Sequence, residues 1–221
     1  MLKTIVVLSV ALASSLQQGI VEQPAVIGAM SEQIEIVATR PVDYGTVFAR
    51  DCFMGDSITG GLSYYGFLRE EQVISRLGFT LKKAAEELEW VRDNQPENIY
   101  LLFGANDLGP GVANESFLAD YRAMIVALRE AAPQAKIYAQ SVMPVTPEEA
   151  LARPHLSAGR MDELNRELYQ LTLEEKINYV NIRKVLQIHA DEYLYEPDGV
   201  HFRSAFDRYW LDYLIEQTKK P

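Results

Sequence analysis

Short apolar runs alternate with amphipathic stretches along most of the chain. Five runs of strand length are each ended by turn or polar residues, and they cover residues 53–54, 73–77, 99–103, 135–139 and 177–182. Between them, apolar residues recur every three or four positions over residues 81–91, 117–128 and 161–171. That spacing places them on one buried face of a helix. A closing helix is predicted over residues 206–214.

This alternation predicts an α/β fold. Parallel strands need long crossover connections, which are usually helices, and strands buried on both faces are almost wholly apolar. We therefore expect a mainly parallel, five-stranded sheet with helices on both faces, a three-layer α/β/α sandwich. In such sheets the loops at the carboxyl ends of the strands form the ligand crevice, so polar residues after each strand carry the functional information.

The first residues differ from the rest. Lys3 is followed by a short apolar stretch over residues 4–13, with small residues nearby, which is typical of a secretory signal. We predict a leader over residues 1–30, a linker or arm over 31–46 and one domain over 47–221. The protein is then secreted or at the cell surface, and the alternative is a cytoplasmic protein whose first strand or helix begins here. The apolar stretch is too short for a comfortable membrane span, so no other membrane insertion is expected.

Composition excludes several classes of protein. Of the 221 residues, 48% are hydrophobic and 24% are charged, as in ordinary globular proteins and unlike disordered chains. The formal net charge of −10 would repel a polyanion, so nucleic acid is not expected as a partner. The single cysteine, Cys52, cannot form an internal disulfide and lies in an apolar run, where we expect a small buried thiol.

Candidate chemistry is concentrated in polar residues near the strand ends and the C-terminus. Ser57 follows the first strand in a Gly-Asp-Ser turn, where its hydroxyl can project into the crevice near backbone N–H donors. Asp198 and His201 lie three residues apart across a glycine turn, so the carboxylate can orient the imidazole. His155 and His189 lack such a partner. Ser57, His201 and Asp198 are therefore candidates for nucleophile, base and orienting acid.

Two further segments can supply an oxyanion hole. Asn106 follows the third strand in a Gly-x-Asn-Asp loop, so its amide can donate to a developing negative charge. Backbone N–H groups of Ser57 and Gly78 can complete the hole, and Gly78 has no side chain to block the approach. Each segment taken singly is also an ordinary turn, and Asp56 and Asp107 are assigned turn roles only. The order of all four segments carries the argument.

That order resembles the SGNH, or GDSL-type, hydrolase family. Gly-Asp-Ser-Ile, a later Gly, Gly-x-Asn-Asp and Asp-x-x-His occur here in sequence, and the four letters map to Ser57, Gly78, Asn106 and His201. The resemblance covers residues 48–214. It implies a flavodoxin-like sandwich and members that include esterases, lysophospholipases, thioesterases, carbohydrate deacetylases and acyltransferases. Residue 59 is Thr, so the Gly-x-Ser-x-Gly elbow of α/β-hydrolases is not present.

The resemblance implies a serine esterase that acts on a short-chain, acetyl-type ester of a small molecule or glycan, without a cofactor or metal ion. A lysophospholipase, a thioesterase or an O-acyltransferase of the same fold remains an alternative. An alternative of another class is a non-catalytic carbohydrate-binding module that kept the fold. A nucleotide-binding protein fits less well, because Asp56 would repel phosphate and no Gly-rich phosphate loop is present. The Pro-rich segment 144–157 is expected to border the crevice, or to be a plain connector.

Overall fold

The computed structural model describes residues 41–219, so the predicted leader and most of the predicted linker lie outside the described residues. The packed unit begins at Pro41, before the predicted domain start at residue 47. A short helix, α1 (Tyr44–Val47), accounts for the difference. Its Tyr44 is buried, and the phenol donates a hydrogen bond of 2.7 Å to Asp212. Residues 41–46 of the predicted arm thus belong to the folded body.

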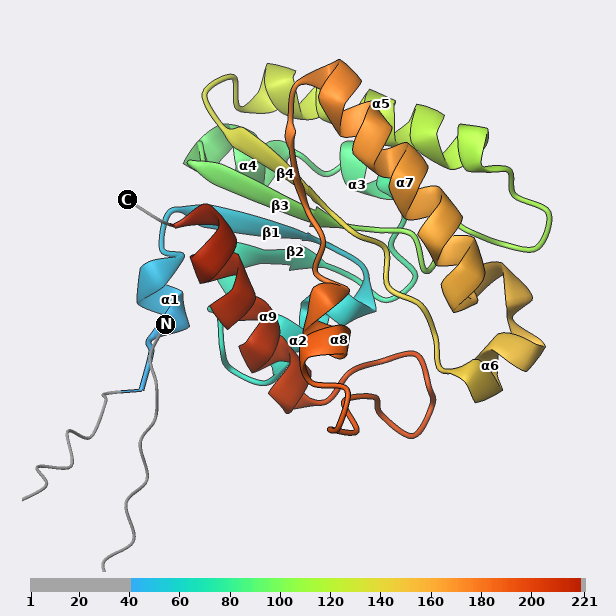
Figure 1. The fold of residues 1–221 in the computed structure, drawn as a ribbon. Coiled ribbons are helices and arrows are strands. Elements are labelled where there is room, and N and C mark those ends of the chain that lie inside the picture. The colour runs from blue at the N-terminus through green and yellow to red at the C-terminus, as the bar shows by residue number, and fades with distance from the viewer. Residues whose placement is uncertain (1–40, 220–221) are drawn as a thin grey trace, which may run out of the picture. The chain divides into compact units, whose positions relative to one another are not determined.

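The centre of the fold is one parallel sheet, as the sequence pattern predicts (Figure 1). Its strands are β1 (Asp51–Gly55), β2 (Val73–Ser75), β3 (Asn98–Leu102), β4 (Lys136–Gln140) and β5 (Asn178–Val180). They lie in the order β2-β1-β3-β4-β5, and every neighbouring pair is parallel. The direction of winding reverses between β1 and β3, which is where ligand sites form in open α/β sheets.

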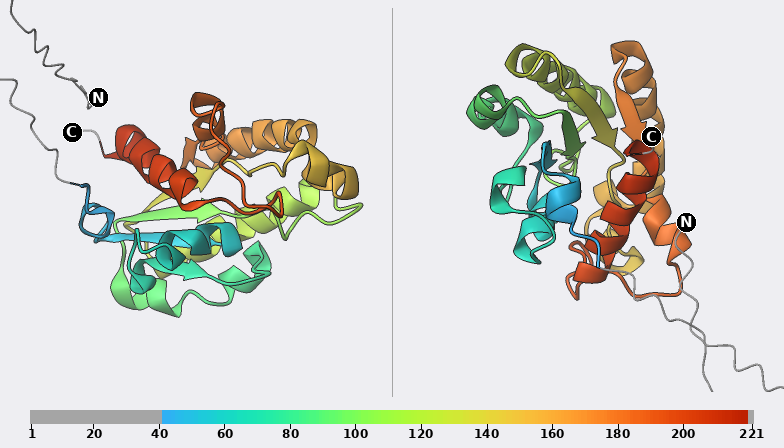
Figure 2. Two further views of the ribbon diagram at one scale, coloured as in Figure 1. Left: turned by 90° about the horizontal axis from the view of Figure 1, so that it is seen from below. Right: turned by 90° about the vertical axis from the view of Figure 1, so that its left-hand side faces the viewer.

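Side chains alternate between two cores along each strand, which places helices on both faces of the sheet (Figure 2). Cys52 and Met54 of β1 face one core, and Phe53 between them faces the other. The first core is covered by α3 (Leu81–Ala85), α4 (Glu89–Asn94), α5 (Asn114–Ala131) and α7 (Ala158–Glu175). The second is covered by α1, α2 (Ser57–Tyr64), α8 (Lys184–Ile188) and α9 (Ser204–Thr218). The predicted three-layer α/β/α sandwich is confirmed.

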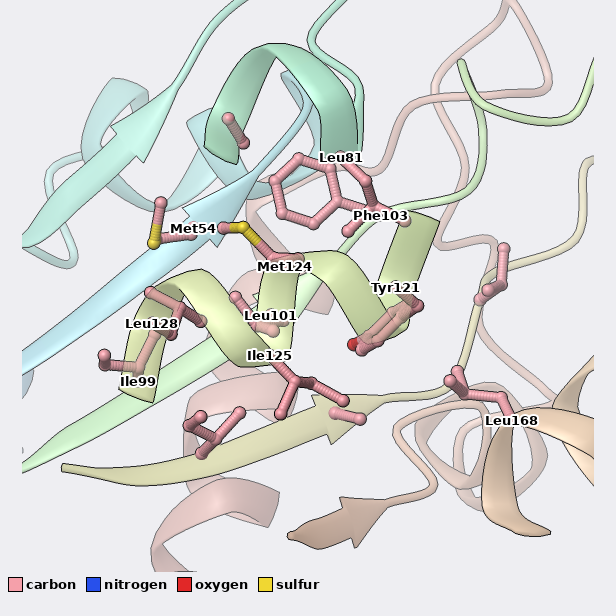
Figure 3. Close-up of a cluster of buried hydrophobic side chains, with 14 of the residues drawn as sticks. Met54, Leu81, Ile99, Leu101, Phe103, Tyr121, Met124, Ile125, Leu128 and Leu168 are labelled. Atoms are coloured by element: carbon pink, nitrogen blue, oxygen red, sulfur yellow. The ribbon is translucent and has the colours of Figure 1, made fainter. Parts of the chain in front are cut away.

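The packing beneath α5 explains why the helix pattern in the sequence was informative (Figure 3). Tyr121, Met124, Ile125 and Leu128 are fully buried and lie over β1 and β3, where Met54 and other strand residues meet them. Burying a side chain of this size stabilises the fold by about 1.5–3 kcal/mol. Cys52 is buried in the same core as a free thiol, as expected, and its burial raises the pKa of that thiol.

Several elements differ from the sequence prediction. The helix expected over residues 81–91 is two helices, because the N–H groups of Glu86 and Glu87 bond to carbonyls three residues back and end α3. Strand β2 stops at Ser75, and Leu77 is exposed instead of buried. The Pro-rich segment contains α6 (Pro147–Ala152) and a 3₁₀ turn (Pro154–Leu156), so it is more ordered than a loop. Another 3₁₀ turn (Glu70–Gln72) leads into β2.

No helix within residues 41–219 combines the length and the apolar character that crossing a membrane requires.

Candidate active site

The turn after β1 presents Ser57 at the start of a helix. Asp56 caps α2, since its carboxylate accepts a 3.0 Å hydrogen bond from the Ile58 N–H, which is the role expected from the sequence. Ser57 is the first residue of α2, where backbone N–H groups have no acceptor within the helix. A side chain at Gly55 would collide with the Leu102 carbonyl of β3, so only glycine lets the turn approach the neighbouring strand.

Ser57, His201 and Asp198 form a continuous chain of hydrogen bonds. Ser57 Oγ lies 2.8 Å from His201 Nε2, although 144 positions separate the two residues. On the other side of the ring, His201 Nδ1 lies 2.6 Å from Asp198 Oδ2. Because the carboxylate can only accept here, Nδ1 carries the proton and Nε2 is left with a lone pair toward the serine hydroxyl. The imidazole is therefore oriented to take a proton from Ser57.

The turn that carries the histidine is fixed by the same aspartate. Asp198 Oδ1 accepts hydrogen bonds of 2.9 Å from the N–H groups of Val200 and His201, while Oδ2 faces the ring. Burial raises the pKa of Asp198, but the hydrogen bonds from the His201 ring and the two N–H groups outweigh it and lower the pKa to about 2. Asp198 is thus ionised at every pH above about 4.

The Pro-rich segment after β4 supports this turn. Gly199 has a left-handed φ of 68°, and its carbonyl accepts a 2.9 Å hydrogen bond from the Thr146 N–H. A side chain at Gly199 would meet the Thr146 hydroxyl 2.6 Å away, so this residue must be small. The segment 144–157 therefore contacts the back of the Asp198–His201 turn. It is not among the walls of the cavity at Ser57 described below.

The loops after β2 and β3 are tied to each other. The Asn106 amide donates a 3.2 Å hydrogen bond to the carbonyl of Phe79, the residue after Gly78. Asp107 accepts a 2.8 Å bond from the Leu81 N–H at the start of α3. Gly78 itself has a left-handed φ of 69°, which favours glycine. The two sequence segments that were assigned to an oxyanion hole thus lie side by side.

The sequence predicts only a turn role for Asp107, and the structure adds the hydrogen bond to the Leu81 N–H. Asp107 is largely desolvated, and burial raises its pKa to about 6. Burial likewise raises the pKa of Asp56 to about 7, with a smaller contribution from the negative charge of Asp107. The Asp107 carboxylate and the Leu81 N–H lie in separate loops, so no short stretch of sequence indicates their contact. The whole Gly-x-Asn-Asp motif is the one sequence signal that draws attention to Asp107.

A cavity of about 380 Å³ opens beside Ser57 and His201. Its walls come from one face of α2, from the residues that follow β2 and from the loop before α9. The other two histidines lie elsewhere: His155 is in a 3₁₀ turn, and His189 stacks on Tyr209 with its ring nitrogen 3.3 Å from Glu192. Neither histidine lines the cavity.

A buried carboxyl lies between α9 and α2. Asp207 of α9 is 1% exposed, and a side chain at Gly61 of α2 would meet its Oδ2 at 2.8 Å. That oxygen has no hydrogen-bond partner among the described residues. Burial raises the pKa of Asp207 to about 8, because an unpaired charge is costly in an apolar surrounding.

This carboxyl should make stability fall as pH rises. The folded protein holds the Asp207 proton up to about pH 8, whereas the unfolded chain releases it near pH 4, so the stabilisation present below pH 4 is lost progressively up to pH 8. A shift of about four units corresponds to about 5 kcal/mol at most. We therefore compare the free energy of unfolding of Asp207→Asn with that of wild type, measured by urea denaturation. The difference in favour of the variant should be larger at pH 9 than at pH 5 by about 2 kcal/mol or more.

The exposed Asp191 provides the control, since Asp191→Asn should leave the pH profile as it is. Asp56 and Asp107 titrate in the same window, so the Asp207→Asn curve should flatten only in part. A wild-type stability that is constant from pH 5 to pH 9 would contradict the assignment of a buried, protonated Asp207.

The parallel sheet has the strand order 2-1-3-4-5 of flavodoxin-like folds. At its carboxyl edge a serine, a histidine and an aspartate are linked by hydrogen bonds, which is the arrangement of a serine hydrolase. The profile of the GDSL-like lipase/acylhydrolase family matches residues 53–208. The chain belongs to this family, and it is an ester-hydrolysing enzyme of the GDSL, or SGNH, type. No curated protein sequence matches the chain.

Solved structures show the same fold at low sequence identity. A GDSL-like lipase from Bacteroides thetaiotaomicron superposes with a TM-score of 0.62 and 19% identity, over 80% of this chain and 91% of that one. A carbohydrate esterase family 3 protein from Talaromyces cellulolyticus gives 0.56 and 17%, over 75% and 94%. A variant of a Geobacillus acetyl-xylooligosaccharide esterase gives 0.56 and 19%, over 77% and 94%. At these identities the likeness concerns the fold.

Proposed function

We propose that this enzyme removes a short acyl group, of the size of acetyl, from a carbohydrate ester through an acyl-enzyme formed on Ser57. The observation that carries the proposal is the hydrogen-bond chain from Ser57 Oγ through His201 to Asp198, with distances of 2.8 and 2.6 Å. A serine hydroxyl is a weak nucleophile unless a positioned base takes its proton, and this chain supplies both the base and the group that orients it.

In the first half of the reaction, Ser57 Oγ attacks the ester carbonyl carbon as its proton passes to His201 Nε2. The carbonyl oxygen becomes negative, and the N–H groups of Ser57 and Gly78 with the Asn106 amide stabilise it. When the tetrahedral intermediate collapses, His201 gives the proton to the leaving alcohol oxygen. The imidazolium that exists in between is stabilised by Asp198, which stays ionised because its pKa is about 2.

In the second half, water replaces the alcohol. The water oxygen attacks the acyl carbon while His201 takes a proton from the water, and the same donors stabilise the oxyanion. The proton then returns to Ser57 Oγ as the carboxylic acid leaves. No step in this scheme uses a metal ion or a cofactor. Each proton that leaves Ser57 or water passes through the one nitrogen that lies 2.8 Å from the serine oxygen.

The preference for a carbohydrate ester is supported by two observations. The cavity at Ser57 is open to solvent, and the charged side chains of Arg76 and Glu196 stand among its mostly apolar walls, where they can bond to the hydroxyl groups of a sugar. Two of the solved relatives are a carbohydrate esterase and an acetyl-xylooligosaccharide esterase. The second candidate, a lysophospholipase or thioesterase, requires an apolar site for a long chain.

Hydrolysis of p-nitrophenyl esters from acetyl to palmitoyl, together with acetylated xylose, tests the proposal. We expect the highest kcat/KM on acetyl and propionyl esters and release of acetate from the acetylated sugar. A preference for chains of eight or more carbons would favour the lipid or thioester alternative. Absence of hydrolysis on every ester, with no labelling of Ser57 by a fluorophosphonate, would contradict the proposal and favour a binding module.

Asn106 provides a separate test of the oxyanion hole. Asn106→Ala should lower kcat by about 10²–10³-fold with little change in KM, because the amide is needed mainly when the oxygen becomes negative. Asn178→Ala is the matched control, since that amide also donates one 3.2 Å hydrogen bond to a backbone carbonyl, that of Ile137, at the far edge of the sheet. A folded Asn106→Ala enzyme with unchanged kcat would show that the hole is built from other groups.

A further inference from the structure

The cavity beside Ser57 lies on a particular side of the reacting atom. Ser57 and His201 both line it, whereas Gly78 and Asn106, the other members of the proposed oxyanion hole, do not. The remaining walls belong to α2, to the residues after β2 and to the loop that ends at Phe202. A group held in this cavity therefore lies next to the imidazole, away from Asn106.

The chemistry of ester cleavage determines which part of the substrate this is. His201 Nε2 must reach the leaving oxygen to protonate it, so the alcohol attached to that oxygen lies on the histidine side of the carbonyl carbon. The carbonyl oxygen faces the N–H groups of Ser57 and Gly78 and the Asn106 amide, and of these residues Gly78 and Asn106 are not among the cavity walls. The cavity is therefore placed to hold the alcohol part of the ester.

Exposed aromatic and aliphatic side chains form the mouth of this cavity. Tyr64, on the last turn of α2, is 83% exposed, and Leu77, after β2, is 88% exposed. Tyr64 stands edge-on to Tyr65, with ring centroids 5.0 Å apart and an interplanar angle of 77°, so one face of an aromatic ring is available beside the cavity. Large apolar side chains gathered at the mouth of a functional cavity mark a surface for a ligand.

Charged groups flank these apolar residues and are held in place. Glu196 accepts a 3.0 Å hydrogen bond from the Tyr65 hydroxyl, and the Arg76 guanidinium donates to Glu87 at 2.6 Å while lying 5.8 Å from the Phe79 ring centroid. These two charged groups can form no hydrogen bond with an alkyl chain. A sugar ring has an apolar C–H face that packs on an aromatic ring and hydroxyl groups at its edge that bond to carboxylate and guanidinium groups.

We propose that Tyr64 and Leu77, with Arg76 and Glu196 at the rim, form a leaving-group subsite that binds the sugar ring bearing the acyl group. The inference rests on the proposed function and adds to it the residues that select the alcohol. The expected signature is selective: the subsite lowers KM for sugar esters and does not contribute to the cleavage of a small alkyl ester. None of these four side chains exchanges a proton with the substrate.

Two substrates with the same acyl group and different alcohols test the proposal, namely acetylated xylo-oligosaccharide and ethyl acetate. Tyr64→Ala and Leu77→Ala should each raise KM for the sugar ester, by about tenfold for Tyr64, with a much smaller loss of kcat/KM for ethyl acetate. Tyr193→Ala and Leu151→Ala are matched controls, because these side chains are 60% and 88% exposed and neither lines the cavity.

Several results would overturn the proposal. Equal losses on both substrates would indicate a structural role for the two residues. A change in preference between p-nitrophenyl acetate and p-nitrophenyl hexanoate, with no effect on the sugar ester, would place the acyl chain in the cavity instead. Normal Ser57-dependent cleavage of ethyl acetate with no advantage for acetylated xylose or acetylated glucose would leave the proposed esterase chemistry intact and remove the sugar subsite.

A binding measurement separates the two proposals fully. Xylobiose and cellobiose, which carry no ester, should bind the wild-type protein in titration calorimetry and inhibit ethyl acetate hydrolysis competitively, and Tyr64→Ala should weaken both effects about tenfold. If the wild-type protein hydrolyses none of the esters but binds the sugars in a Tyr64-dependent manner, the proposed function is contradicted and the subsite is not. Absence of binding of both sugars to the active enzyme would contradict the subsite alone.

Discussion

Ser57→Ala is expected to lower kcat for ester hydrolysis by about 10⁴–10⁶-fold. Without the hydroxyl, no acyl-enzyme forms, and His201 loses the group whose proton it takes at 2.8 Å. The residual rate would come from binding of the substrate and from the oxyanion donors alone. The melting temperature should change little, since Ser57 is the first residue of a helix and lies at the edge of the cavity.

The measurement combines initial rates on p-nitrophenyl acetate with labelling by a fluorophosphonate and mass spectrometry of the labelled peptide. Ser63→Ala on the same helix is the control, because its hydroxyl makes only a 3.3 Å bond to the Gly60 carbonyl. Wild-type protein should carry one label at Ser57, and the variant none. Full activity in Ser57→Ala, or a label on another serine, would contradict the assignment of the nucleophile.

Asp198→Asn should lower kcat by about 10²–10⁴-fold while the turn keeps its shape. The Asn side-chain oxygen can still accept from the N–H groups of Val200 and His201, as Asp198 Oδ1 does at 2.9 Å. The amide nitrogen would then face His201 Nδ1 and donate to it, which moves the ring proton to Nε2, where it blocks transfer from Ser57. The negative charge that stabilises the imidazolium is lost as well.

The pH dependence distinguishes this explanation from a general loss of structure. Since the pKa of Asp198 is lowered to about 2, the wild-type carboxylate is charged at every pH above about 4, so protonation of Asp198 itself should leave no step in the wild-type pH profile between pH 5 and pH 9. Asp198→Ala, which removes the acceptor of two backbone N–H groups, should lose stability in addition to activity. Equal activity of Asp198→Asn and wild type would exclude an orienting role.

Much of the fold could be predicted because the information is local. The strands at residues 99–102 and 136–140 are apolar runs, and α5 and α7 have apolar residues at the spacing of one helix face, so short windows of sequence contain the signal. Short elements were harder. The helix α1, whose Tyr44 is buried, and the break after α3 depend on distant contacts and on a change of hydrogen-bond pattern that residue periodicity does not encode.

Pairs of residues close in sequence were equally accessible. Asp198 and His201 are three positions apart across a turn, and Asp56 caps the helix that begins one residue later, so both interactions follow from local geometry. The supporting contacts were not accessible in this way. The hydrogen bond from the Thr146 N–H to the Gly199 carbonyl joins a segment that precedes α7 in the chain to one that follows it. The hydrogen bonds that link Asn106 and Asp107 to the loop of Gly78 span more than twenty residues.

The alternation of strands and helices, the two-sided burial of the sheet and the residue types at each strand end follow from the amino-acid sequence, because propensity, periodicity and turn chemistry act over a few residues. The folded chain is needed to bring Ser57 and His201, 144 positions apart, to 2.8 Å from each other and to place the exposed Tyr64 and Leu77 beside them. Parallel strands bring their carboxyl ends to one edge of a sheet, and that arrangement, which no segment contains alone, makes separate turns into a single site.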